Sequence, residues 1–178
     1  MPALCDEPQA YLLRNDAYEN EYYILENRQQ RGWDASLPGS GIVVFHVDYD
    51  KEIWEGITEW PNSTTLKRYS IIPANNSTST SSTSMARWPY PFETNNELTN
   101  TSKPAATLNH PNSDGTKLLS KPVTGMTMTD GLASFEVLKE PTAVTERTVS
   151  TTSKVLYDLG PIYIIRCANG EIKKVMKH

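Results

Sequence analysis

The sequence predicts a mainly β fold, an antiparallel sheet or sandwich with long irregular loops and a small C-terminal hairpin unit. Three observations support this prediction. β-Branched and aromatic residues alternate with other residues along several short runs, as is typical of strands. Asp130-Gly131, a dipeptide suited to a type I′ turn, lies between two such runs. No segment of the 178 residues keeps a helical period.

The first three predicted strands lie close together in the sequence. Residues 11–13 and 21–27 are rich in β-forming side chains, and NDAYEN between them favours a turn, so we expect a hairpin. The next run, GIVVFHVDYD at 41–50, is again β-branched and aromatic. Because Pro38 and Gly39 interrupt what precedes it, this run predicts a buried central strand.

The middle of the chain is expected to be mostly irregular. LKRYSIIPA at 66–74 predicts one more strand, which Pro73 ends. NNSTSTSSTS at 75–84 cannot bury enough apolar surface to offset the entropy of ordering, so it predicts an exposed loop. Residues 85–120 show little periodicity. We expect three aromatic residues to hold this segment at the edge of the core: Trp88, Tyr90 and Phe92.

The C-terminal part contains two hairpin signals. Val123–Thr129 and Leu132–Val137 flank Asp130-Gly131. After the polar connector PTAVTERTVSTTS, the segments YIIRC and IKKVM flank Ala-Asn-Gly. The sequence therefore predicts a β-rich region at 1–140, a polar linker at 141–153 and a small β-hairpin tail at 154–178.

Composition argues against several classes of protein. The chain has 17 basic and 21 acidic residues and a formal net charge of −4, so no nucleic-acid partner is expected. No run approaches the roughly 18 apolar residues of a membrane helix, and MPALCDEPQA does not have the pattern of a signal peptide. Cys5 and Cys167 are far apart and lack C-x-x-C spacing, so we expect two free thiols.

A candidate functional cluster lies at the end of the predicted strand at 41–50. Alternate side chains of a strand share a face, so His46, Asp48 and Asp50 should point the same way. This spacing would suit a metal site, or a histidine held in one tautomer by a carboxylate. The other interpretation is structural, because a strand that leaves the core becomes polar at its end.

Glu26 and Arg28 close the preceding strand, and Arg28 would pair naturally with a carboxylate. If the two strands pair, we expect these residues to form one polar cluster with His46, Asp48 and Asp50. Calcium could be held at this edge, where Glu52 and Glu55 follow, although the D-x-D-x-D-G loop that supplies calcium ligands is missing. The cluster is therefore expected to be mainly structural.

No catalytic set can be completed from the sequence. It contains no H-E-x-x-H motif, which would present two zinc ligands and a general base on a helix. It contains no G-x-S-x-G nucleophile elbow, no phosphate-binding loop and no dinucleotide fingerprint. We therefore expect that this chain alone is not an enzyme and has no certain cofactor.

The segment EYYILENRQQRGWDASLPGSGIVVFHVDYD at 21–50 resembles the region that follows the zinc-binding helix in secreted metallopeptidases of the immune inhibitor A type. In that family a pattern of EYY-LLENRQ, GWD, LPG-GLL and WH-hydrophobic-D recurs. The resemblance continues more loosely through 68–74, PFETNN and KPVTGMTMTDGLASFEVL. The closing VLYDLGPIYIIRCANGEIKKVMKH resembles the C-terminal tails of exported proteins of Bacteroidetes-type bacteria.

The resemblance implies that the chain is a non-catalytic, β-rich C-terminal portion or remnant of such a peptidase. Its partner would be the missing catalytic domain, which would bind zinc outside this chain, and its location would be extracellular or on the cell surface. The alternative is a free-standing β-sandwich module that binds a glycan or a protein through exposed tryptophans. The candidates are Trp54, Trp60 and Trp88, which could equally be core or interface anchors.

Overall fold

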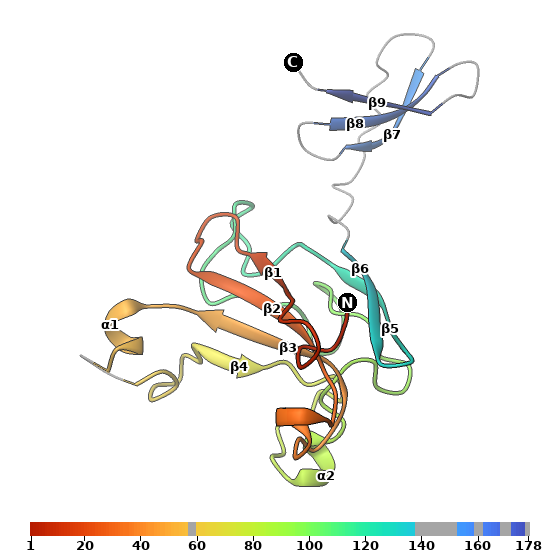
Figure 1. Ribbon diagram of the computed structural model, residues 1–178. Coiled ribbons are helices and arrows are strands. Elements are labelled where there is room, and N and C mark those ends of the chain that lie inside the picture. Colours follow the sequence, from red (N-terminus) through yellow and green to blue (C-terminus); the bar gives the residue numbers. More distant parts are fainter. Residues whose placement is uncertain (57–59, 138–152, 159–161, 168–171, 177–178) are drawn as a thin grey trace. The chain divides into compact units, whose positions relative to one another are not determined.

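The computed structural model describes residues 1–56 and 60–137, and the backbone of three further strands between 153 and 176 (Figure 1). The chain divides into two compact units, Met1–Leu138 and Lys139–His178. The predicted linker lies outside the described residues except for Ser153. The strands form antiparallel sheets, which confirms the mainly β class.

The first unit is built on a four-stranded antiparallel sheet with the order β1-β2-β3-β4 (Figure 1). Its strands are β1 (Ala10–Arg14), β2 (Glu21–Arg28), β3 (Gly41–Asp48) and β4 (Tyr69–Ile71). The predicted hairpin of the first two strands is confirmed. β3 lies between β2 and β4, as expected for a buried central strand.

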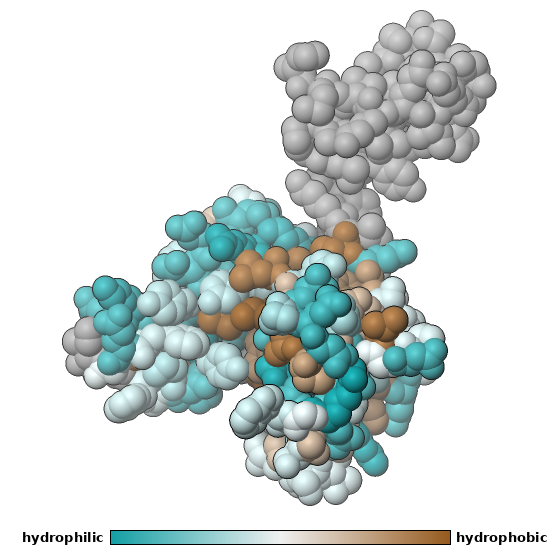
Figure 2. Space-filling view, viewed as in Figure 1, coloured by the Kyte–Doolittle hydropathy of each residue, from teal (hydrophilic) through white to brown (hydrophobic). Residues whose placement is uncertain are grey.

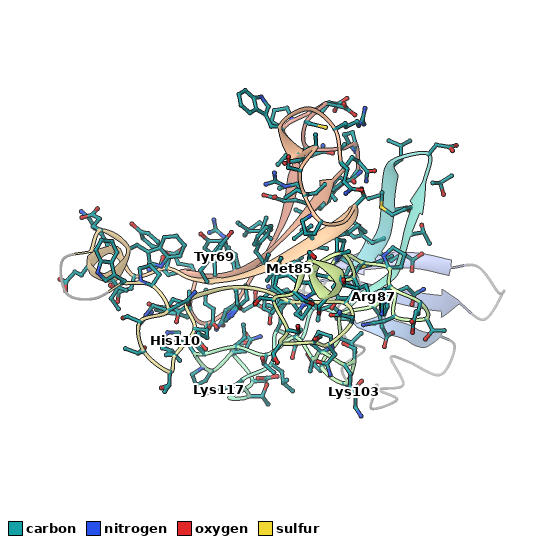
Figure 3. The ribbon with its side chains drawn as sticks, turned by 90° about the horizontal axis from the view of Figure 1, so that it is seen from below. Tyr69, Met85, Arg87, Lys103, His110 and Lys117 are labelled. Atoms are coloured by element: carbon teal, nitrogen blue, oxygen red, sulfur yellow. The ribbon has the colours of Figure 1, made fainter. Side chains whose placement is uncertain are left out.

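One face of this sheet, called here the inner face, packs on the core. Tyr23, Leu25, Ile42 and Val44 alternate along β2 and β3 on this face and are fully buried. They join a core cluster with residues of the segment 98–126. Figure 3 shows His110 and Lys117 on this side of the sheet, and the connection between β2 and β3 on the other side.

The opposite face of the sheet, called here the outer face, stays partly open. Ile24, Val43, Phe45 and Ile71 are half-buried on it, and Tyr69 is exposed. Figure 2 shows hydrophobic residues gathered at the centre of the visible face of this unit. The sheet therefore has apolar side chains on both faces, but the residues of the first unit fully bury only the inner face.

A second, two-stranded sheet completes the first unit. β5 (Val123–Thr129) and β6 (Leu132–Val137) have the predicted bounds. Asp130 and Gly131 have φ angles of 51° and 79°, as the predicted type I′ turn requires. Of the three aromatic residues expected at the edge of the core, Tyr90 is fully buried and forms a bridge with Ile42, whereas the other two are half-buried.

The helical elements are single turns: η1 (Gly32–Asp34), α1 (Lys51–Trp54) and α2 (Ser82–Met85). The predicted strand at 41–50 ends at Asp48, because the Asp50 side chain accepts hydrogen bonds from the backbone of Glu52 and Ile53 and caps α1. Neither α-helix of the described part has the length or apolar character to cross a bilayer.

β4 is much shorter than the predicted strand at 66–74. The side chain of Asn62 lies against its open edge: its Oδ1 accepts hydrogen bonds from the backbone N–H groups of Arg68 and Tyr69, and its Nδ2 donates to the carbonyl of Tyr69. A side chain here takes the place that a fifth strand would occupy at Tyr69.

The second unit is a three-stranded antiparallel sheet of β7 (Ser153–Asp158), β8 (Ile162–Cys167) and β9 (Ile172–Met176). β8 and β9 pair as the Ala-Asn-Gly signal predicts. β7 was not predicted as a strand, although Gly160-Pro161 between it and β8 is a turn signal. Of the two cysteines, Cys5 is exposed and free, and the side chain of Cys167 lies outside the described residues.

Candidate functional site

The most polar part of the interior lies where β2 begins and β3 ends. Glu21 is the first residue of β2 and pairs directly with Asp48, the last residue of β3. Both side chains are on the inner face and 0% exposed. Two carboxylates placed directly opposite each other repel, so each requires its own hydrogen-bond donors to remain charged in the interior.

Glu21 is surrounded by donors. Its Oε1 lies 2.8 Å from Nε2 of His46 and accepts a hydrogen bond from the backbone N–H of Asn109. Its Oε2 accepts from the backbone N–H of His110 at 3.0 Å and from Nδ2 of Asn15 at 3.2 Å. Burial alone would raise the pKa of Glu21, but these four hydrogen bonds outweigh it and lower the pKa below its usual value.

Asp48 has a different set of partners. Its Oδ2 lies 3.1 Å from a guanidinium nitrogen of Arg68 and accepts a hydrogen bond from Nδ2 of Asn109 at 2.9 Å. Its Oδ1 lies 3.3 Å from Nε2 of His110, in poor hydrogen-bond alignment, and neither atom has another partner among the described residues. The His110 ring also packs against the ring of Tyr18, with ring centroids 4.1 Å apart.

The network joins segments that are far apart in the sequence. Asn109 and His110 lie 88 and 89 residues after Glu21 and bind its carboxylate through their backbone. The same two residues contact Asp48 through their side chains. The carboxylate pair therefore fastens the loop around 109–112 to the end of the sheet.

The structure places the predicted cluster residues in three separate roles. His46 and Asp48 share the inner face as expected, but His46 contacts Glu21 and Asp48 contacts Arg68. Asp50 caps α1 and takes no part in the network. Within the part of the chain that the structure describes, no three or more His, Cys, Asp or Glu residues are grouped to hold a metal ion.

Glu26 and Arg28 lie at the opposite end of the sheet, so the prediction of one joint cluster is wrong. Because β2 and β3 are antiparallel, Arg28 pairs with Gly41 at the start of β3. Arg28 does pair with carboxylates: it binds Oε2 of Glu26 at 2.6 Å and Oδ1 of Asp34 at 3.0 Å. Burial alone would lower the pKa of Arg28, but the two carboxylates raise it.

Besides Asn15, sequence reasoning missed four members of the network: Glu21, Arg68, Asn109 and His110. Glu21 could have been found, since it shares strand parity with Tyr23 and Leu25 and must therefore face the core. The other three lie in an irregular segment or just before a short strand. Their position depends on tertiary contacts that no local pattern reports.

We expect Asp48→Asn to lower the free energy of unfolding by about 2 kcal/mol, because the charge-assisted contact with Arg68 is lost. If the role of Asp48 is structural, the loss will be equal in chelator and in millimolar calcium. Thermal melts of both proteins under both conditions measure this. A bound calcium ion would instead stabilise only the wild type, by about 2.7 kcal/mol at 100 times its dissociation constant.

Comparison of the chain with family models, with curated proteins and with solved structures finds no match.

Proposed function

We propose that this chain is the non-catalytic, β-rich portion of a secreted zinc metallopeptidase of the immune inhibitor A type, and that it supports the catalytic part of that protein. The sequence resemblance over 21–50 supports the family. The observation that carries the supporting role is the partly open outer face of the sheet, which has the composition of an interface.

Aromatic side chains form a continuous row on and beside the outer face. The ring centroids of Tyr49 and Trp54 are 5.7 Å apart, and those of Trp54 and Tyr69 are 5.9 Å apart. Tyr69 stacks on Phe45 at 5.6 Å and is 42% exposed. Aromatic residues are enriched at protein interfaces and supply much of their binding energy. The row is therefore well suited to a protein partner.

The aromatic row ends at an apolar cavity of about 290 Å³. It lies between the outer face and the segments before β3 and around α2, and its lining includes Leu37, Pro38, Val43, Phe45, Ile71, Met85 and Trp88. Arg28 also lines it, but its guanidinium group is already bound by two carboxylates. The cavity offers no free charge, so it suits an apolar side chain of a partner.

In this proposal, zinc binding and water activation belong to the catalytic part, which carries the H-E-x-x-H motif. The protein would act outside the cell or at the cell surface, as the family resemblance implies. The buried carboxylates of this chain would keep the sheet and the loop around 109–112 in a fixed arrangement behind the interface.

A free-standing binding module is the second candidate function. Trp60 favours it, since it is 72% exposed. The other two predicted tryptophans are half-buried: Trp54 donates a hydrogen bond from Nε1 to the carbonyl of Asp48, and Trp88 lines the apolar cavity. They fit the role of anchors rather than of an exposed ligand platform.

The test is to isolate the protein from its natural source with an antibody against this chain, together with any polypeptide bound to it. The isolated material is then assayed for gelatin cleavage. We expect chelator-sensitive cleavage by material that contains an H-E-x-x-H polypeptide, and no cleavage by this chain alone with added zinc. Tyr69→Ala should reduce the amount of gelatin-cleaving material that is isolated with the chain, whereas Trp33→Ala in η1 should not, because the Trp33 side chain is fully exposed. Zinc-dependent cleavage by the isolated chain would refute the proposal. It would also be refuted if the protein from its natural source had no associated peptidase.

A further inference from the structure

The segment NNSTSTSSTS borders a polar hollow of about 420 Å³ that plays no part in the proposed function. One side is formed by small polar side chains: Asn75, Ser77, Ser79, Ser81, Thr83 and Ser84. Arg87, Phe92 and Glu93 complete its lining. Figure 3 shows Arg87 beside α2, which the serine-rich segment forms.

The hydroxyl groups that line this hollow hydrogen-bond to one another, and some of their O–H donors have no acceptor among the described residues. Oγ of Ser77 accepts hydrogen bonds from the backbone N–H of Ser79 and from Oγ of Ser84. Oγ of Ser81 accepts from Oγ of Ser79 and from the backbone N–H of Ser84. The O–H donors of Ser77 and Ser81 have no acceptor among the described residues, and the Thr83 hydroxyl has no partner there.

Two opposite charges line the hollow without forming an ion pair. The guanidinium group of Arg87 lies 5.7 Å from the centre of the Phe92 ring, a cation–π arrangement. Within the described part of the chain, neither Arg87 nor Glu93 makes a salt bridge or a side-chain hydrogen bond. A donor group and an acceptor group are thus held around the same space, together with hydroxyl groups that can act as either.

From this arrangement we infer that the hollow binds a neutral saccharide. A sugar ring presents several hydroxyl groups, so it can accept from Arg87 and from the free serine hydroxyls while it donates to Glu93. An oxyanion can only accept, and the carboxylate of Glu93 would repel it. The charges of Arg87 and Glu93 cancel, so an uncharged ligand with both donors and acceptors fits the site better than an anion.

The inference can be tested by amide NMR titration of the ¹⁵N-labelled chain. The probes are glucose, galactose, mannose and N-acetylglucosamine, with inorganic sulfate as the anion probe. They are added up to about 50 mM, because a millimolar dissociation constant corresponds to only about −4 kcal/mol. We expect at least one sugar to shift the amide signals of Ser77, Arg87 and Glu93 in a saturable manner, and sulfate to leave them unchanged.

Matched variants separate this site from general surface effects. Arg87→Gln and Thr83→Val should each weaken sugar binding, the first by about tenfold or more, since a charged hydrogen-bond donor is lost. Arg14→Gln alters an exposed arginine far from the hollow, and Thr80→Val alters a threonine of the same segment that does not line it, so both should bind like the wild type. Thermal melts establish that all four variants fold. The inference is overturned if no sugar shifts these signals, if sulfate alone shifts them, or if Arg87→Gln binds sugar normally.

Discussion

Glu21→Gln is expected to lower the free energy of unfolding by about 3 to 5 kcal/mol, because several hydrogen bonds to one buried carboxylate are lost or weakened together. The substituted amide keeps the shape of the carboxylate, but its NH₂ group would face N–H donors of His46, Asn109 or His110. His46 is buried, and the two backbone N–H groups could turn to water only if the loop moved. The loop around 109–112 would lose its attachment to the sheet. Urea denaturation followed by tryptophan fluorescence measures the change.

Glu19→Gln provides the control for this substitution. Glu19 lies two residues earlier, and its side chain is 83% exposed. Its only ionic contact in the described part of the chain is Arg14, at 4.0 Å. We expect its loss to change stability by no more than about 0.5 kcal/mol. If Glu21→Gln were equally mild, the network would not hold the loop.

The same network makes stability depend on pH in a defined direction. The pKa of Glu21 in the folded protein is lower than the value of 4.5 that it has in an unfolded chain. Its contribution to stability is therefore fully present above pH 4.5 and is lost as the pH falls through the folded-state pKa. Below pH 4.5 the wild type should lose stability more steeply than Glu21→Gln. Parallel curves for the two proteins would contradict this.

Gly41→Ala is expected to cost about 2 to 5 kcal/mol, because backbone strain and steric conflict add at this position. Gly41 has a φ of +141°, and a Cβ atom there would lie 2.6 Å from the carbonyl oxygen of Tyr90 and 2.9 Å from Cβ of Pro89. Ile42 and Tyr90 exchange two backbone hydrogen bonds of 2.8 Å next to this contact. An alanine would push the segment at 89–90 away from β3 and weaken these bonds.

Gly115→Ala separates the two causes. Gly115 also has a positive φ, of +79°, but a Cβ atom there would meet nothing within 4 Å. It should therefore show backbone strain alone, at about 1 to 2 kcal/mol. Chemical denaturation of both variants gives, as the difference, the loss at Gly41 beyond that of an unobstructed left-handed position. Equal losses would show that the contact between Gly41 and Tyr90 is not tight.

The hairpins were the most predictable part of the fold. The alternation in Val123–Thr129 and Leu132–Val137, with Asp130-Gly131 between them, gave both strands with their observed bounds. Here the turn residues adopt the positive φ that their identity favours. Strand ends were less predictable, because they depend on caps: Asp50 belongs to α1 and not to β3, which only its hydrogen bonds reveal.

For the candidate site, the sequence could predict only which side chains share one face of a strand. His46 and Asp48 share a face, as alternation requires. Their distance from Arg28 depends on register, and the antiparallel pairing puts Arg28 at the other end of the ladder. His110 lies in a segment without periodicity, so its contact with Asp48 could not be read from the sequence. Local patterns report faces and turns, whereas this network is assembled by long-range contacts.

The hydrogen bonds between Asn62 and β4 also affect how readily another chain could add to this edge of the sheet. An open strand edge is a template on which another chain can add, and it is a common start of aggregation. At Tyr69 both backbone groups are already taken by the Asn62 side chain, so an incoming strand would first have to displace it. Asn62 therefore protects this edge of the sheet. Its replacement by alanine would leave the edge open to pairing with another chain.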